Sequence, residues 1–354
     1  MQKLWILVVM SGLVGLYLFS CSTGKMHPSG IDFSKVPFEH LSDYGFFKGE
    51  QNKLMPSPGV LPYRPASELF SDHAEKSRFV WMPEGASASI LDTGYHHLAF
   101  PDKSILIKNF YYSQSENEKQ RIIETRLLIK MEGEWNAFAY LWNDKQTEAK
   151  YEIVGATIPV TFTETYGTKH SIEYIQPNKN QCKSCHNQGE KLVPIGPKVR
   201  NLNFAFDYGN GEMKNQLTKW REAGYLESFD QADLESCMVD YEDKTSSLGL
   251  RSKAYLDINC AHCHSPKGPA SSSGLFLTYE EKDPTRWGVY KTPVAAGFGA
   301  GSFTYGIQPG KADSSIFIHR MKSEQVGVMM PEIGRAMVHK EGVELISEWI
   351  NSMD

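Results

Sequence analysis

The chain has 354 residues, of which 41% are hydrophobic and 22% are charged, and its formal net charge is −5. This composition is ordinary for a soluble globular protein and leaves room for two or three domains. The acidic balance and the lack of a long basic run in the sequence argue against nucleic acid as a partner.

Residues 1–21 predict an export signal. A lysine at position 3 precedes an apolar run, Leu4 to Phe19, which is short for a membrane-spanning helix. The run leads into Leu-Phe-Ser-Cys and resembles a bacterial lipoprotein signal, which implies cleavage before Cys21 and a membrane-anchoring lipid on that residue. Ser22 then implies an exported, periplasm-facing lipoprotein of the outer membrane. An uncleaved membrane anchor is the alternative. Residues 22–50 are expected to be a linker.

Two pentapeptides of the pattern C-x-x-C-H account for four of the six cysteines. They read CKSCH from position 182 and CAHCH from position 260. Two thiols one helical turn apart suit the two vinyl groups of one haem, and the adjacent histidine suits the iron. We therefore expect two covalently attached haem c groups. The expected attachment residues are Cys182, Cys185, Cys260 and Cys263, and the expected iron ligands are His186 and His264.

Two other uses of C-x-x-C are disfavoured. A thioredoxin-like redox pair needs a βαβ context, which the sequence around both motifs lacks. A zinc ribbon spaces its pairs about 15–20 residues apart, and here the pairs are much further apart. Cys237 is left over and is expected to be a buried or inert thiol. His262, inside the second motif, is expected to be partly exposed.

Residues 248–354 resemble a class I cytochrome c domain. A stretch with helical spacing leads into the second motif, and an amphipathic stretch, KEGVELISEWI from position 340, ends the chain. Between them lies VMMPEIG, from position 328. The resemblance implies an all-α fold and makes Met330, before Pro331, the second axial ligand of the iron. Met329 and Met337 are its competitors.

Residues 51–190 predict a β-rich domain. Its segments are rich in β-branched and aromatic residues and are separated by polar turns, which favours an antiparallel sheet that runs directly into the first motif. Residues 191–247 are expected to be a mostly helical connector. The expected fold class is thus multidomain α+β, with an N-terminal antiparallel β domain closing on a haem motif and a C-terminal all-α cytochrome c domain.

The order of sheet and motif in residues 51–190 resembles the cytochrome c′-beta family and its lysine-cross-linked relatives, which oxidise hydroxylamine. The match is carried by FPDKSILIK, Phe100 to Lys108, and by the later strand with Trp135. Lys103 and Ser104 replace the Gly-Thr of that family and change the turn. In the cross-linked members, the lysine at the position of Lys108 is bonded to the haem, and in the others it is not. The sequence leaves both cases open.

The whole chain also resembles a family of exported di-haem c-type cytochromes of unestablished function, through phrases such as LFSDHAEKSRFVWMPEG, PIGPKVRNLN and YLDINCAHCH. The expected function is electron transfer in the cell envelope with a periplasmic redox protein as partner. The alternative is a haem enzyme or gas-binding protein that acts on peroxide, nitric oxide or hydroxylamine at an open first haem. Met213 or Met238 are candidate ligands of that iron. Lys198 and Arg200 are candidates to neutralise haem propionates or are simply solvated.

Overall fold

The computed structural model describes residues 30–91, 97–113, 120–164, 167–230, 237–294 and 296–354. The export signal expected at residues 1–21, with Cys21, lies outside these ranges. Within them, no helix combines the length and the apolar character that crossing a bilayer requires.

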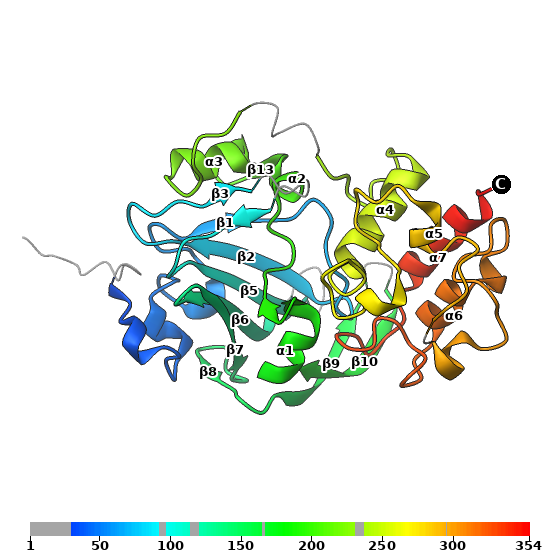
Figure 1. Cartoon of the computed structure of the whole chain (residues 1–354). Coiled ribbons are helices and arrows are strands. Elements are labelled where there is room, and N and C mark those ends of the chain that lie inside the picture. Colours follow the sequence, from blue (N-terminus) through cyan, green and yellow to red (C-terminus); the bar gives the residue numbers. More distant parts are fainter. Residues whose placement is uncertain (1–29, 92–96, 114–119, 165–166, 231–236, 295) are drawn as a thin grey trace, which may run out of the picture.

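A six-stranded antiparallel sheet is the largest element (Figure 1). Its strands, in spatial order, are β1 (Leu61–Tyr63), β2 (Glu75–Trp81), β5 (Ile105–Tyr112), β6 (Arg121–Met131), β7 (Glu134–Trp142) and β8 (Ala149–Tyr151). A small ladder of β3 (Ser89–Ile90) and β4 (Leu98–Ala99) lies between β2 and β5 in the sequence. The two-residue turn between β6 and β7 has Glu132 at φ 53° and Gly133 at φ 80°, the positive values that a type I′ hairpin turn requires.

One face of the sheet is closed by residues that precede β1. Ile105 and Ile107 point into this core, where Leu41, Tyr44 and Phe46 from the N-terminal segment pack against them. These turns are Phe33–Lys35, Leu41–Tyr44 and Gln51–Lys53. The expected linker at residues 22–50 is therefore wrong for its described part, because the aromatic side chains there bury apolar surface of the sheet.

The opposite face is covered by α2 (Val199–Leu202) and α3 (Gln216–Glu222), whose Trp220 is fully buried there. Between the two helices lies a hairpin of β13 (Ala205–Asp207) and β14 (Met213–Asn215). The expectation that residues 191–247 are mostly helical is wrong, because the described part holds only these two short helices. Gly209 and Gly211 take positive φ in the hairpin turn, a conformation that interrupts a helix.

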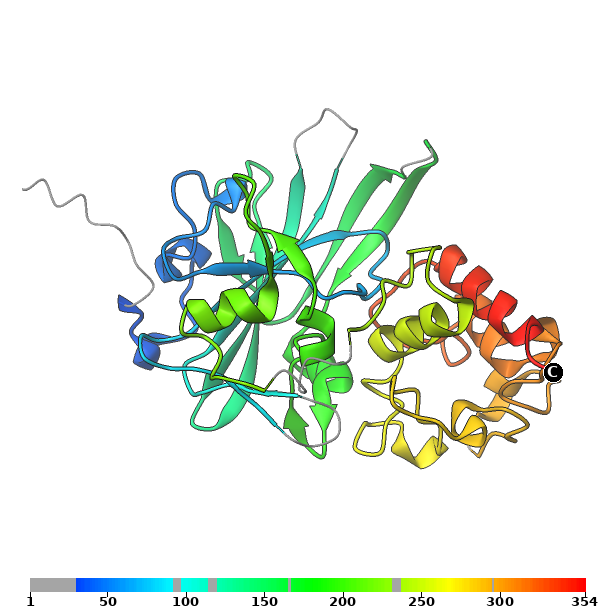
Figure 2. The ribbon, with the colours of Figure 1, turned by 90° about the horizontal axis from the view of Figure 1, so that it is seen from above.

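A second hairpin, β9 (Ala156–Thr163) and β10 (Lys169–Gln176), follows the main sheet. Phe162 and Tyr174 from this hairpin pack against Tyr112 and Phe110 at the end of β5. The chain then enters α1 (Lys179–His186) and a short ladder of β11 (Asn187–Gln188) and β12 (Lys191–Leu192). Figure 2 shows that this hairpin lies beside the main sheet and next to the C-terminal part of the chain.

The expected fold class is wrong for residues 248–354, which do not form a clear all-α cytochrome c domain. Their helices are α4 (Leu248–Asn259), α5 (Pro284–Trp287), α6 (Ile316–Lys322) and α7 (Lys340–Asn351), and only α4 and α7 exceed seven residues among those described. Turns, 3-10 segments and irregular chain fill the rest, since this stretch is rich in glycine, proline and serine, which are poor helix formers. The protein as a whole is mainly an antiparallel sheet with few helices.

Helices α4 and α7 approach closely because Gly342 faces Tyr255. A Cβ at position 342 would overlap the Tyr255 ring, whereas nothing lies within 4 Å of a Cβ at Gly249, in the first turn of α4. We expect Gly342→Ala to lower the free energy of unfolding by about 1–3 kcal/mol through overpacking. Gly249→Ala should leave it unchanged or raise it by about 0.5–1 kcal/mol. Denaturant titrations of both variants test this, and equal effects would contradict the assigned contact.

Candidate functional site

The first C-x-x-C-H motif lies on α1, which begins directly after β10 because Asn178 caps it. Asn178 Oδ1 accepts a hydrogen bond from the Gln181 amide at 2.9 Å, and Gln181 Oε1 accepts one from the Asn178 amide at 2.9 Å. This capping box satisfies two amides that a helix start leaves free. Helical spacing then puts Cys182, Cys185 and His186 on one face of α1, because residues i, i+3 and i+4 are neighbours.

The His186 ring is held in one tautomer. Its Nδ1 lies 2.8 Å from the Val193 carbonyl oxygen, which can only accept, so Nδ1 carries the proton and Nε2 keeps its lone pair. The Val193 amide in turn donates to the His186 carbonyl at 2.7 Å. Burial lowers the pKa of His186 to about 3, so the imidazole is neutral at physiological pH. A neutral imidazole oriented through Nδ1 is the form that binds a metal.

The second motif forms one further turn at the end of α4. The His264 amide donates to the Cys260 carbonyl at 2.9 Å, so Cys260, Cys263 and His264 repeat the spacing of the first motif. His264 Nδ1 lies 3.3 Å from Ser273 Oγ, and that hydroxyl donates its own proton to the Ala270 carbonyl at 2.6 Å. Nδ1 of His264 must therefore be the donor, which again leaves Nε2 free. Burial lowers the pKa of His264 to about 4.

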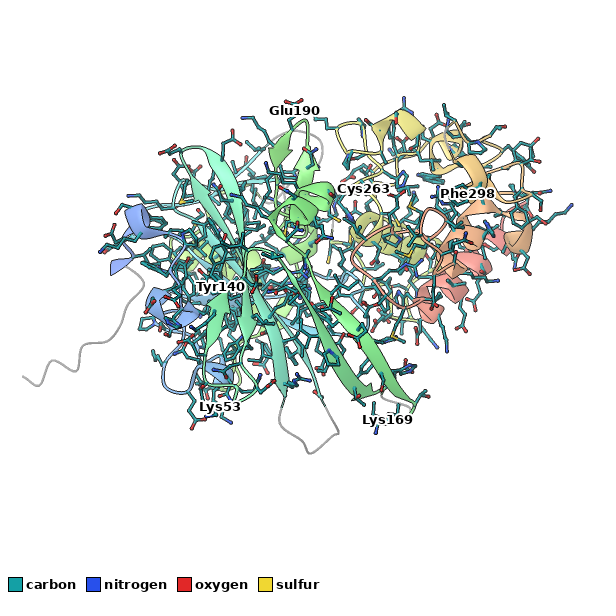
Figure 3. The ribbon with its side chains drawn as sticks, turned by 90° about the horizontal axis from the view of Figure 1, so that it is seen from below. Lys53, Tyr140, Lys169, Glu190, Cys263 and Phe298 are labelled. Carbon is teal, nitrogen blue, oxygen red and sulfur yellow. The ribbon has the colours of Figure 1, made fainter. Side chains whose placement is uncertain are left out.

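The two motifs touch. One ligand atom each of Cys185, His262 and Cys263 lie within 4.8 Å of one another, and Cys263 Sγ is 3.9 Å from the Ser184 carbonyl oxygen. Figure 3 places Cys263 beside α1. A hydrogen bond from the Cys263 thiol lowers the pKa of Cys185 to about 5 and raises that of Cys263. The site therefore joins two motifs that are distant in the sequence.

Met330 lies on a loop that is tied to α6. Its amide donates to the Arg320 carbonyl at 3.0 Å, and Arg335 donates to its carbonyl at 3.0 Å. The Arg320 cation contributes to the lowered pKa of His264, and Glu332, two residues after Met330, contributes to the raised pKa of Cys263. The charged neighbours of Met330 are thus close to the second motif. Its competitor Met337 packs against the core formed by β9 and β10 instead.

Lys108 lies on β5 near the first motif. Burial lowers the pKa of this lysine well below its ordinary value, and the cations Arg78, Lys76 and Arg126 lower it further. Lys108 and Arg126 both contribute to the low pKa of His186. Arg126 was missed from the sequence, since only the pairing register of β5 and β6 places it beside Lys108.

Other residues considered from the sequence have different places. Met213 is 63% exposed on β14, and Met238 is buried in the core of the C-terminal part. Cys237 is exposed, which rules out the buried thiol of the two alternatives and leaves the prediction of an inert thiol. Lys198 pairs with Asp257 at 3.0 Å, and Arg200 pairs with Glu280. His262 is partly exposed, but its contact with Cys185 was not foreseen.

Comparison of the chain with protein-family models, with curated proteins and with solved structures gave no match.

The cap of α1 can be tested locally. Asn178→Ala removes the side-chain acceptor of the capping box and should destabilise the helix by about 1 kcal/mol. Asn180→Ala changes an exposed residue inside the same helix whose side chain caps nothing, and should have little effect. Hydrogen exchange of the α1 amides should speed up about five-fold in the first variant only. Unchanged exchange in Asn178→Ala would show that the cap does not hold the motif.

Proposed function

We propose that the chain is a di-haem c-type cytochrome that transfers electrons in the cell envelope. One observation carries the proposal: each C-x-x-C-H motif forms a single helical turn whose histidine has a proton on Nδ1 and an unused Nε2, and the two turns are in contact. The residues fit a covalent haem, because each turn offers two thiols and one neutral imidazole on the same face. Bound haem would supply a one-electron couple.

The chain's own residues would determine how that couple works. Cys182 and Cys185 would hold the first group and Cys260 and Cys263 the second, with His186 and His264 as iron ligands. The Val193 carbonyl and the Ser273 hydroxyl orient the two imidazoles. Because Cys185 and Cys263 meet, the attachment points would be adjacent, and charge could pass between them without movement of either part of the chain. A periplasmic redox protein would exchange electrons with this pair of haems.

The enzyme or gas-binding alternative is favoured by the surroundings of the first motif. Met213 is exposed and Met238 is buried elsewhere, so neither candidate methionine supports a sixth ligand for His186's iron. An open position is what peroxide, nitric oxide or hydroxylamine chemistry needs. We nevertheless favour electron transfer, since the contact between the two motifs suits a relay.

A second candidate is a site for a soft metal ion. Cys185, His262 and Cys263 offer two sulfurs and one ring nitrogen within 4.8 Å, a donor set that suits zinc. The two proposals compete, because a sulfur bonded to haem is no longer a thiolate. Metal analysis separates them.

The main test is cofactor content after production with haem-attachment machinery. We expect two covalent haems per chain by mass and by pyridine haemochrome spectrum. Cys182→Ala/Cys185→Ala and Cys260→Ala/Cys263→Ala should each lose one haem, while Cys237→Ala, which alters the exposed thiol, keeps both. A chain that carries zinc and no haem would overturn the cytochrome proposal in favour of the metal site.

Met330 is proposed as the second ligand of the His264 iron. In the ferrous protein, Met330→Ala should open that iron and add one carbon monoxide site per chain relative to wild type. Met337→Ala is the matched control, because Met337 packs against the β9–β10 core, and it should add none. A Met330→Ala protein with an unchanged carbon monoxide difference spectrum would rule Met330 out.

Export and lipidation are part of the same proposal. If Cys21 carries a lipid, the protein should sediment with membranes, and Cys21→Ala should release it into the soluble fraction or block its maturation. Membrane association that persists unchanged in Cys21→Ala would instead favour an uncleaved N-terminal anchor.

A further inference from the structure

Three cations stand in a row across the centre of the sheet. Arg78 on β2 is paired directly with Lys108 on β5, and Lys108 is paired directly with Arg126 on β6. Directly opposite residues of antiparallel strands share a face, and like charges in such positions destabilise a sheet. The row is therefore costly unless something of opposite charge compensates it.

The row lies on the face of the sheet that carries α2, α3 and the first motif. Side chains alternate along a strand, and Leu106, two residues before Lys108, belongs to the core under α2 and α3. Val80 and Leu128 place Arg78 and Arg126 on the same face in the same way. In Figure 1, α1 lies in front of the sheet near β7, with which it is in contact. The row thus points to the side on which His186 is held.

The protein's own acidic groups compensate the row only in part. Glu68 lies 3.2 Å from Arg78, and Glu124 pairs with Arg126. Lys108 has no hydrogen bond or ion pair to any described residue, and its ammonium instead lies 4.7 Å from the centre of the Phe110 ring. Lys76, on β2, adds a fourth cation nearby, and the acidic groups that act on it are Glu68, Asp72 and Glu242. Among the described residues, Lys108 is therefore the member of the row whose charge is left over.

Donor atoms are left over as well. The Arg78 side chain is only 6% exposed, yet its Nη1 is buried without a hydrogen-bond partner among the described residues. Nε of Arg126 is likewise buried without a hydrogen-bond partner among the described residues. Buried guanidinium donors without an acceptor are rare, and carboxylates and phosphates are the partners that a guanidinium fork fits best. Both the charge and the free donors call for an anion.

We propose that Arg78, Lys108 and Arg126 form a binding site for a carboxylate or small oxyanion beside the first C-x-x-C-H motif. The anion has two possible sources: a propionate of a haem held by α1, or a free oxyanion from solution. Only the first source rests on the proposed function. In either case Lys108 supplies the central charge, and the two guanidinium groups supply directed hydrogen bonds from either side.

The test uses the full-length protein with its native cofactors, as wild type and as Lys108→Met, with Lys150→Met as control. Lys150 is an exposed lysine on the edge strand β8 that pairs with Glu39. Thermal unfolding is followed at constant ionic strength while inorganic phosphate or acetate replaces chloride. Haem content and the midpoint potentials of the haems are measured on the same samples.

A free oxyanion site predicts that phosphate or acetate raises the unfolding midpoint of wild type and of Lys150→Met by several degrees and saturably, and that Lys108→Met loses this rise. A propionate site predicts no such rise. Instead, Lys108→Met should lower the unfolding midpoint and shift the potential of one haem downwards, because a cation that favours the reduced state is lost. Either result supports the proposal.

If no anion binds to the row, Lys108→Met should raise the unfolding midpoint, because it relieves repulsion between the cations. Oxyanions should then have no effect, and the haem potentials should not shift. That result overturns the proposal. If Lys108→Met does not fold, Arg126→Gln replaces it, and the wild-type titration stands by itself. A protein with two haems but no effect refutes the anion site alone, while an oxyanion effect in a protein without haem refutes only the cytochrome proposal.

Discussion

The contact between α1 and the turn at residues 260–264 is the interaction on which the functional arrangement depends. It brings Cys263 against the Ser184 carbonyl, and beside it the Gly189 amide donates to the Lys267 carbonyl at 3.1 Å. Gly268 allows this turn to close, since a Cβ there would overlap the Cys263 carbonyl. Without this contact the two motifs would be separate sites on separate parts of the chain.

Other polar contacts fix the C-terminal part of the chain, residues 248–354, relative to the sheet. Asp72, in the loop before β2, accepts hydrogen bonds from the Ala336 and Met337 amides at 2.8 Å. Asn259, at the end of α4, accepts one from the Phe70 amide at 2.8 Å. These bonds are directional and buried or half-buried, so they specify one relative position. The Met330 loop and the second motif are thereby fixed relative to the sheet.

A buried ion pair contributes to the same alignment. Burial alone would raise the pKa of Asp257, but the cations Lys198 and Arg200 hold it below its ordinary value. Asp257 also accepts a hydrogen bond from the Tyr279 amide at 3.0 Å. Breaking one partner of such a pair would leave a buried charge, which costs far more than the pair itself contributes. Lys198 and Arg200, which the sequence suggested as partners of haem propionates, thus contribute to the packing of α4.

Local sequence patterns were enough to predict the strands and the helical turns of the two motifs. The strands lie in the stretches of β-branched and aromatic residues, and the spacing of each C-x-x-C-H motif fits the helical turn that it forms. Features that depend on pairing between distant residues could not be predicted from the sequence. The register that aligns Lys108 with Arg126, the contact of His262 with Cys185, and the burial of Tyr44 under the sheet all join residues distant in the sequence.

The prediction of an all-α cytochrome c domain was wrong for a related reason. Helical spacing near position 255 and in residues 340–350 correctly located two helices, but it carries no information on the long stretch between them. There, chain direction is set by turns and by individual contacts such as that of Arg335 with the Met330 carbonyl, which no periodic pattern records. A motif and two flanking helices do not by themselves specify a fold.

The two faces of the sheet differ in the charge that they bury. One face is closed mainly by aromatic and aliphatic side chains, and its buried polar residues Asn109 and Thr125 are neutral and hydrogen-bonded to each other, an arrangement that stability favours. On the other, β2, β5 and β6 carry Arg78, Lys108 and Arg126, with Glu124 fully buried beside them and bonded to the Tyr174 hydroxyl. Buried charges cost stability, and apolar residues would fit the same strands. Because Arg78, Lys108 and Arg126 lie beside the first motif, an anion bound there would offset part of that cost.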